Sequence, residues 1–291
     1  MNNKKSRISL SFGFFSILWH KIPEISEEKN IHIIEEELSE NPVLLVVEDS
    51  SDLRKFINMI LGDQYKVIEA NDGEEGLDKS FDLIPDVIIS DIMMPGMNGF
   101  QLCHKLKNDS RTSHIPLILL TARATIQDKI SGLNEGADEY ITKPFEAEEL
   151  KARINNLLEQ RKRLHEHFRK YGLVEIVDKN ITTLDQQFLR RVVEKISERI
   201  SDDTFGVEVL AEELNVSRSL LFKKIESLVG ESPSELIKRT RLNRAALLIE
   251  KRIGNVSEIA LDVGFSNPSY FAECFKKQFG ISPSQYHLTS N

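Results

Sequence analysis

The sequence predicts an α/β domain with a doubly wound, five-stranded parallel sheet, followed by a separate all-α domain. Between residues 42 and 160, short apolar runs alternate with segments of helical period. From Leu184 onward the pattern is wholly helical, with no convincing strand. A length of 291 residues agrees with about two domains.

The first strand is expected at residues 43–47, a run with the length and β-branched content of a buried parallel strand. Ser50 or Ser51 can cap the following helix, which carries apolar residues at i, i+3, i+4 and i+7 through about Leu61. The remaining strands are expected near residues 65–69, 86–90, 115–120 and 139–141, and the remaining helices of this domain near 73–80, 99–107, 125–134 and 146–168. We divide the chain into an N-terminal segment (1–41), the α/β domain (42–160), a connector (161–184) and the helical domain (185–291).

The N-terminal segment is the hardest to assign. Basic residues precede an apolar stretch at residues 8–19, as in a signal peptide. That stretch is shorter than the roughly 20 residues that span a bilayer, and no cleavage-site pattern follows it. We expect a strand or a remnant of an upstream domain, followed by an acidic linker.

Charge is distributed unevenly along the chain. The net charge is −8, yet residues 185–291 hold 15 basic and 15 acidic residues, so the whole acidic excess lies in residues 1–184. Residues 215–278 are locally basic, with 11 basic residues to 7 acidic ones. This distribution suits a metal site joined to a phosphate-binding surface. The two cysteines, Cys103 and Cys274, are expected to be buried free thiols, which indicates a cytoplasmic protein.

Five polar residues follow the ends of predicted strands: Glu48, Asp49, Asp91, Thr121 and Lys143. In a doubly wound sheet, ligands bind beyond the carboxyl ends of the strands. Any one of these residues could be an ordinary loop residue, but a hydrophobic core does not require all five at one edge. Three converging carboxylates repel one another unless a cation such as Mg²⁺ lies between them. The sequence therefore predicts a magnesium site at which Asp91 attacks a phosphodonor, with Lys143 neutralising charge on the phosphoryl oxygens.

Residues 42–160 resemble a response-regulator receiver domain. The motifs that carry the resemblance are Val-Val-Glu-Asp at 46–49, Asp-Ile-Met-Met-Pro-Gly-Met-Asn-Gly at 91–99, Leu-Thr-Ala-Arg at 120–123, and Gly-Ala-Asp-Glu-Tyr-Ile-Thr-Lys-Pro-Phe at 136–145. The resemblance implies the strand order 2-1-3-4-5 and Asp91 as the phosphoacceptor. It places Glu48, Asp49 and the Met93 backbone carbonyl around Mg²⁺. It also implies that Thr121 and Tyr140 are paired switch residues, that Lys143 binds the phosphoryl group, and that the Lys143–Pro144 bond is cis.

The C-terminal third repeats a helix, short turn, helix pattern at residues 209–225 and 256–279, joined by a basic helix at 234–251. One such pattern is a weak signal, because small helical bundles imitate it; two copies are a stronger one. Residues 185–287 resemble the AraC-type DNA-binding domain. The motifs that carry this resemblance are Arg-Leu-Asn-Arg-Ala-Ala-Leu-Leu at 241–248, Gly264-Phe265, Tyr270-Phe271 and the stretch from Phe279 to Tyr286.

The resemblance implies two recognition helices in successive major grooves. The residues expected to face DNA are Arg218, Ser219, Phe222 and Lys223 from the first helix, and Pro268, Ser269, Ala272 and Glu273 from the second. Lys224, Lys276 and Lys277 are expected to contact phosphates. Phe222 could instead pack in the core. Glu273 stands where the family usually has a basic residue, so the readout of the second helix is open.

The sequence thus predicts a two-component transcription regulator that is not an enzyme. Its expected partners are a histidine kinase as phosphodonor, DNA, and a second copy of the chain on DNA. Because no kinase motif is present, an alternative is the C-terminal part of a hybrid sensor that joins kinase and regulator in one polypeptide. A Mg²⁺-dependent aspartyl-phosphate hydrolase fits less well, since Met93 stands where that chemistry needs a second acid.

Overall fold

The computed structural model describes residues 41–122, 136–171 and 183–289. The N-terminal segment through residue 40, the helix expected at 125–134 and most of the loop expected after Tyr171 lie outside the described residues. Within the described ranges, no helix is long and apolar enough to cross a membrane.

The predicted parallel sheet is confirmed, with strand order β2-β1-β3-β4-β5. All four strand pairs are parallel. The strands are β1 (Val43–Val47), β2 (Lys66–Ala70), β3 (Val87–Asp91), β4 (Leu117–Thr121) and β5 (Glu139–Thr142). Every residue of β3 and β4 is buried, as expected for central strands that are covered on both faces.

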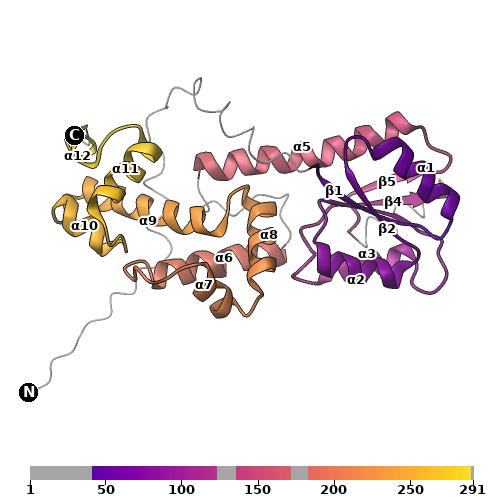
Figure 1. Cartoon of the computed structure of the whole chain (residues 1–291), viewed down its shortest axis with the longest axis horizontal. Coiled ribbons are helices and arrows are strands. Elements are labelled where there is room, and N and C mark those ends of the chain that lie inside the picture. The colour runs from indigo at the N-terminus through magenta and orange to yellow at the C-terminus, as the bar shows by residue number, and fades with distance from the viewer. Residues whose placement is uncertain (1–40, 123–135, 172–182, 290–291) are drawn as a thin grey trace, which may run out of the picture.

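Helices cover both faces of the sheet, and each face has its own apolar core (Figure 1). One core packs α2 (Gly73–Leu83) and α3 (Gly99–Asn108) against residues such as Leu45 and Leu119. The other packs α1 (Ser51–Leu61) and α5 (Ala147–Tyr171) against residues such as Leu44 and Ile118. Alternate residues of one strand therefore serve opposite cores, as the pleat of a strand requires.

The last helix of the α/β domain, expected at residues 146–168, runs past the domain boundary placed at residue 160, as predicted. Helix α5 continues to Tyr171, and Figure 1 shows it leaving the sheet to lie along the helical domain. Phe168, near its end, is fully buried in the first core of the helical domain. The connector is therefore partly a structural element shared by both domains.

The helical domain has two apolar cores, one around each predicted helix-turn-helix. Its helices are α6 (Thr183–Glu198), α7 (Val207–Leu214), α8 (Arg218–Val229), α9 (Pro233–Glu250), α10 (Val256–Asp262), α11 (Pro268–Phe279) and α12 (Pro283–Thr289). Helix α9 joins the halves, since Leu236 belongs to the first core and Leu242 to the second. Ser217 caps α8 by accepting a hydrogen bond from the Leu220 backbone N–H, as predicted.

Candidate functional site

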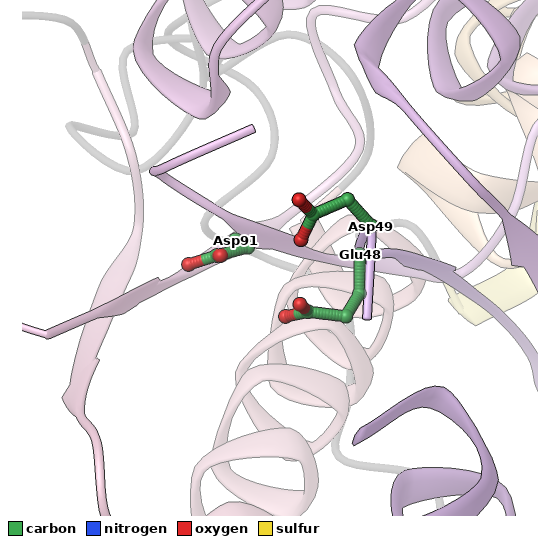
Figure 2. A group of neighbouring side chains, drawn as sticks. All are labelled: Glu48, Asp49 and Asp91. Carbon is green, nitrogen blue, oxygen red and sulfur yellow. The ribbon is translucent and has the colours of Figure 1, made fainter. Parts of the chain in front are cut away.

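Three carboxylates meet at the carboxyl edge of the sheet. Glu48 and Asp49 follow β1, and Asp91 ends the neighbouring strand β3. One oxygen of each carboxylate lies within 4.8 Å of those of the other two, and Figure 2 shows the three side chains turned toward one space. Glu48 and Asp91 are buried, whereas Asp49 is exposed. Solvent therefore reaches the cluster from the side of Asp49.

Lys143 supplies the positive charge of the site. Its ammonium lies 2.8 Å from a Glu48 oxygen and 3.0 Å from an Asp91 oxygen. The backbone also connects the neighbouring strand ends, because the Lys143 N–H donates to the Thr121 carbonyl at 2.7 Å. The Lys143–Pro144 peptide bond is cis, as the resemblance implied.

The electrostatics of the cluster favour a bound cation. Burial raises the pKa of Glu48, the negative charge of Asp91 raises it further, and the hydrogen bond from Lys143 opposes both effects. A divalent cation would favour the ionised form of these acids. Octahedral Mg²⁺ holds oxygens at about 2.0–2.1 Å, so opposite ligands lie about 4 Å apart. The all-oxygen donor set therefore fits Mg²⁺, and the carboxylate oxygens, within 4.8 Å of one another, would close slightly around the ion.

The other predicted residues of this site are placed as follows. Thr121 is buried at the end of β4, and Tyr140 is half-buried on β5, packed against one core of the sheet. Met93 lies in the loop after β3 with a side chain that is 73% exposed. Thr121 and Lys143 thus lie at the same edge as the acids, as predicted, and the roles of all these residues remain predictions.

Two residues that the sequence reasoning missed position the acids. Arg54 on α1 donates from one guanidinium nitrogen to the backbone carbonyls of Glu48 and Asp49, and from another to the Glu69 carboxylate. Gly99 begins α3 so close to β3 that an added Cβ would lie 2.2 Å from the Asp91 carbonyl oxygen. Hydrogen bonds from Arg54 therefore fix the loop of acids, and close packing at Gly99 fixes the strand end bearing Asp91. The sequence signal that could have identified Arg54 was an arginine in the second turn of the helix after β1.

The predicted DNA-facing residues of the first helix-turn-helix divide into two groups. Arg218, Ser219 and Phe222 are exposed on α8, and Phe222 at 41% exposure does not pack in the core. Lys223 is half-buried, and its ammonium donates to the Leu83 carbonyl of the α/β domain at 2.6 Å. The three exposed residues lie in the first half of α8, and the half-buried Lys223 lies at its middle.

Lys224 corrects the expectation of a phosphate contact. Its side chain is only 1% exposed, and its ammonium forms an ion pair of 2.8 Å with Asp185, which is equally buried. The ammonium also donates to the Ser110 carbonyl of the α/β domain. In this arrangement Lys224 joins two domains and does not reach DNA.

The second helix-turn-helix leaves its predicted contacts available. Five of the six predicted residues on α11 are exposed and Ala272 is half-buried; the exposed ones are Pro268, Ser269, Glu273, Lys276 and Lys277. Asn267 caps α11 by accepting backbone hydrogen bonds, and Phe271 and Phe275 anchor the opposite side of the helix in the core.

Both cysteines are free thiols; Cys103 is buried as expected, whereas Cys274 on α11 is only partly buried.

Comparison with known families agrees with this architecture. Residues 44–155 match the sequence model of the response regulator receiver domain, and residues 210–288 match that of a helix-turn-helix domain. The chain therefore contains a response-regulator receiver domain followed by an AraC-type helix-turn-helix domain.

Known relatives include both longer kinases and shorter regulators. Histidine kinase P4 of Formosa agariphila is 39% identical over 280 residues, which are 96% of this chain and 20% of that protein. Response regulator ArlR of Staphylococcus aureus is 37% identical over 151 residues, covering 52% of this chain and 63% of that protein. A crystal structure of a putative response regulator from Chloroflexus aurantiacus is 36% identical, with a TM-score of 0.39, covering 40% of this chain and 98% of that one. The chain thus spans less than two thirds of the length of P4 and of ArlR.

Proposed function

We propose that this chain is a sequence-specific transcription regulator controlled by phosphorylation of Asp91. The observation that carries the proposal is the cluster at the sheet edge, where the buried Asp91 lies within reach of two further acids and of the Lys143 ammonium. Asp91 would accept the phosphoryl group from a phosphohistidine of a histidine kinase. Working with a kinase donor and with DNA would place the protein in the cytoplasm.

Each residue of the cluster has a distinct proposed role. Glu48, Asp49, Asp91 and the Met93 carbonyl would hold Mg²⁺, which when bound supplies positive charge for the phosphoryl oxygens. Lys143 already lies 3.0 Å from Asp91 and would pair with the phosphoryl group once it is attached. The new phosphoryl oxygens would accept a hydrogen bond from Thr121, and Tyr140 would move with it.

On DNA, the two helix-turn-helix units would place α8 and α11 in adjacent major grooves. The exposed residues Arg218, Ser219 and Phe222 of α8, together with those of α11, are the candidate readers of sequence. Pairing of two chains on a duplicated site would raise affinity through effective concentration.

The direct test is phosphoryl transfer from acetyl phosphate, measured by intact-protein mass spectrometry with and without Mg²⁺. The native chain should gain one phosphoryl group in a Mg²⁺-dependent reaction, and Asp91→Asn should gain none. Asp78→Asn, at an exposed acid of α2, is the matched control and should react normally. Labelling of Asp91→Asn at the native rate would refute the assignment of Asp91.

A second candidate places the same residues inside a longer protein. The match to histidine kinase P4 over 96% of this chain favours it, because there the corresponding segment is part of a kinase polypeptide. In that case the phosphodonor would be covalently linked to this segment. Kinase-coding DNA in frame upstream of Met1 would support this candidate, and an unrelated upstream gene would contradict it.

A further inference from the structure

The outward face of α11 has a carboxylate at its middle. Phe271 and Phe275 are fully buried in the second core of the helical domain, so they fix which side of α11 faces inward. Glu273 lies two residues from each of them and is therefore rotated by about 160° from both, at about 100° per residue. Its side chain is exposed. The residue of α11 that points most directly away from the core is thus an acid.

Further contacts hold α11 in this rotation. Asn267 caps the start of the helix by accepting backbone hydrogen bonds. Near its end, the Gln278 side chain donates to the Asn243 side chain of α9 at 2.6 Å. The ring centre of Phe275 lies 5.4 Å from that of Tyr286 on α12. Because both ends and the inner side are held, the outward position of Glu273 is a fixed property of the domain.

Two lysines flank the acid on the exposed face. Lys276 and Lys277 are exposed and follow Glu273 by three and four residues, which places them about 60° to one side of it and about 40° to the other. A glutamate and a lysine four residues apart often pair on a helix. Within the described part of the chain, however, the Glu273 carboxylate forms neither an ion pair nor a hydrogen bond. The carboxylate is therefore available to an external donor.

This arrangement matches the chemistry of a major groove. A helix in the groove has base edges in front of its outermost residues, and phosphates lie along both walls. The two lysines, one on each side, suit the phosphates of the walls. A carboxylate would be repelled by those phosphates, so the middle of the helix face, opposite the base edges, is the position where DNA can accommodate an acid.

The pattern of donors in the groove then selects the base. Only the N4 amino group of cytosine and the N6 amino group of adenine donate hydrogen bonds there, whereas guanine and thymine present acceptors. Adenine also presents its N7 acceptor beside the amino group, and that acceptor repels a carboxylate. Cytosine presents a donor with no acceptor, so it is the base that Glu273 fits best.

We propose that Glu273 determines specificity by accepting a hydrogen bond from the N4 amino group of a cytosine in the half-site contacted by α11. This inference rests on the proposed DNA-binding function. The equivalent position of α8, two residues from the buried Leu221 and Ile225, is Lys223, which has the opposite charge. The two half-sites should therefore differ at the corresponding base pair.

The test is selection of binding sites from a randomised duplex library by the full chain, with acetyl phosphate and Mg²⁺ present throughout. The site selected by the native chain should contain a cytosine that Glu273→Gln replaces with adenine, because glutamine pairs with adenine N6 and N7. The remaining positions should be unchanged, which also shows that the variant folds. Glu212→Gln, at an exposed acid of α7, makes the same charge change and should retain the cytosine.

A modified base tests the same contact on the native chain. N4-methylcytosine still pairs with guanine, but a methyl group replaces the amino hydrogen that faces the major groove. In anisotropy titrations, this base at the selected position should weaken binding by the native chain about fivefold or more, as a mismatched base pair does. The affinity of Glu273→Ala should change by less than about twofold, since that variant has no carboxylate to lose the bond.

The outcomes separate the inference from the proposed function. An unchanged selected site for Glu273→Gln, or equal losses of affinity for the native chain and Glu273→Ala on the methylated site, would overturn the role of Glu273 while leaving sequence-specific binding intact. Uniformly tighter binding of all sequences by Glu273→Gln would also overturn it, because the acid would then only repel phosphates. Failure of the native chain to select any site would refute the proposed function and this inference with it.

Discussion

The buried pair of Lys224 and Asp185 offers a sharp test of the energetics of the domain junction. The pair is 2.8 Å apart and each side chain is only 1% exposed, so solvent screening does not weaken it. Asp185→Asn keeps the shape but leaves the ammonium with the Ser110 carbonyl and the face of Phe188, whose ring centre lies 4.8 Å away. Removing one partner of a buried pair costs about 3–5 kcal/mol, because the other charge stays buried without compensation.

The expected result is a large loss of stability in urea. With a slope of about 1–3 kcal/mol per molar, a loss of 3–5 kcal/mol lowers the unfolding midpoint by roughly 2 M. Replacing both partners, as in Lys224→Met with Asp185→Leu, should recover most of the loss, since an apolar pair carries no desolvation cost. Unfolding followed by circular dichroism provides the measurement.

The matched control is the pair Arg218–Glu208 in the same domain, which is 2.9 Å apart but 70% and 66% exposed. Glu208→Gln should cost less than about 1 kcal/mol, as exposed pairs do. If Asp185→Asn lowers stability no more than this control, the buried pair does not hold the junction and the reasoning fails.

Three further predictions concern the receiver. Arg54→Ala should lower the affinity for Mg²⁺ about 10-fold in calorimetry, because the Arg54 guanidinium fixes the backbone carbonyls of the acidic loop. The control Lys55→Ala, at an exposed neighbour, should leave that affinity unchanged, and equal effects of the two substitutions would exclude a positioning role for Arg54. Gly99→Ala should lower the free energy of unfolding by about 1–3 kcal/mol and slow phosphorylation, because the added Cβ would meet the Asp91 carbonyl. In the control Gly206→Ala the added Cβ meets nothing closer than 3.7 Å, so thermal unfolding should be nearly unchanged. A stability of Gly99→Ala equal to that of the native chain would refute the close-packing argument. Hydrogen bonds from Arg111 lower the pKa of Asp109 below its ordinary 3.8, so the ionised Asp109 carboxylate stabilises the folded chain fully above that pH and loses this effect below it. The difference in free energy of unfolding between the native chain and Asp109→Asn should therefore narrow as the pH falls below 3.8. A difference that stays constant with pH would contradict the assignment.

The sheet and its acidic edge followed from local pattern. Apolar runs predict all five strands, and the rule that ligands bind at the carboxyl ends of parallel strands predicts that Glu48, Asp49 and Asp91 lie together. The boundaries shifted by a residue or two for local reasons. Tyr65, for example, was expected in β2, but its N–H donates to the Leu61 carbonyl, so the strand begins at Lys66.

The junction between the domains could not be predicted in the same way. Lys223 and Lys224 are adjacent lysines on a recognition helix, and local sequence makes both look like DNA contacts. Lys223 instead contacts the Leu83 carbonyl, and Lys224 contacts Asp185 and Ser110. These partners are distant in sequence from α8, so pattern alone cannot bring them together. Phe168 is a similar case, since helical period predicts a buried position but not which domain buries it.

The central claim is that phosphorylation of Asp91 changes DNA binding, and genome-wide mapping of binding sites with and without acetyl phosphate and Mg²⁺ tests it most directly. We predict that the phosphodonor alters the occupancy of sites bound by the native chain and leaves that of Asp91→Asn unchanged. Identical site maps for the native chain in both conditions, or an equal response from Asp91→Asn, would contradict the claim.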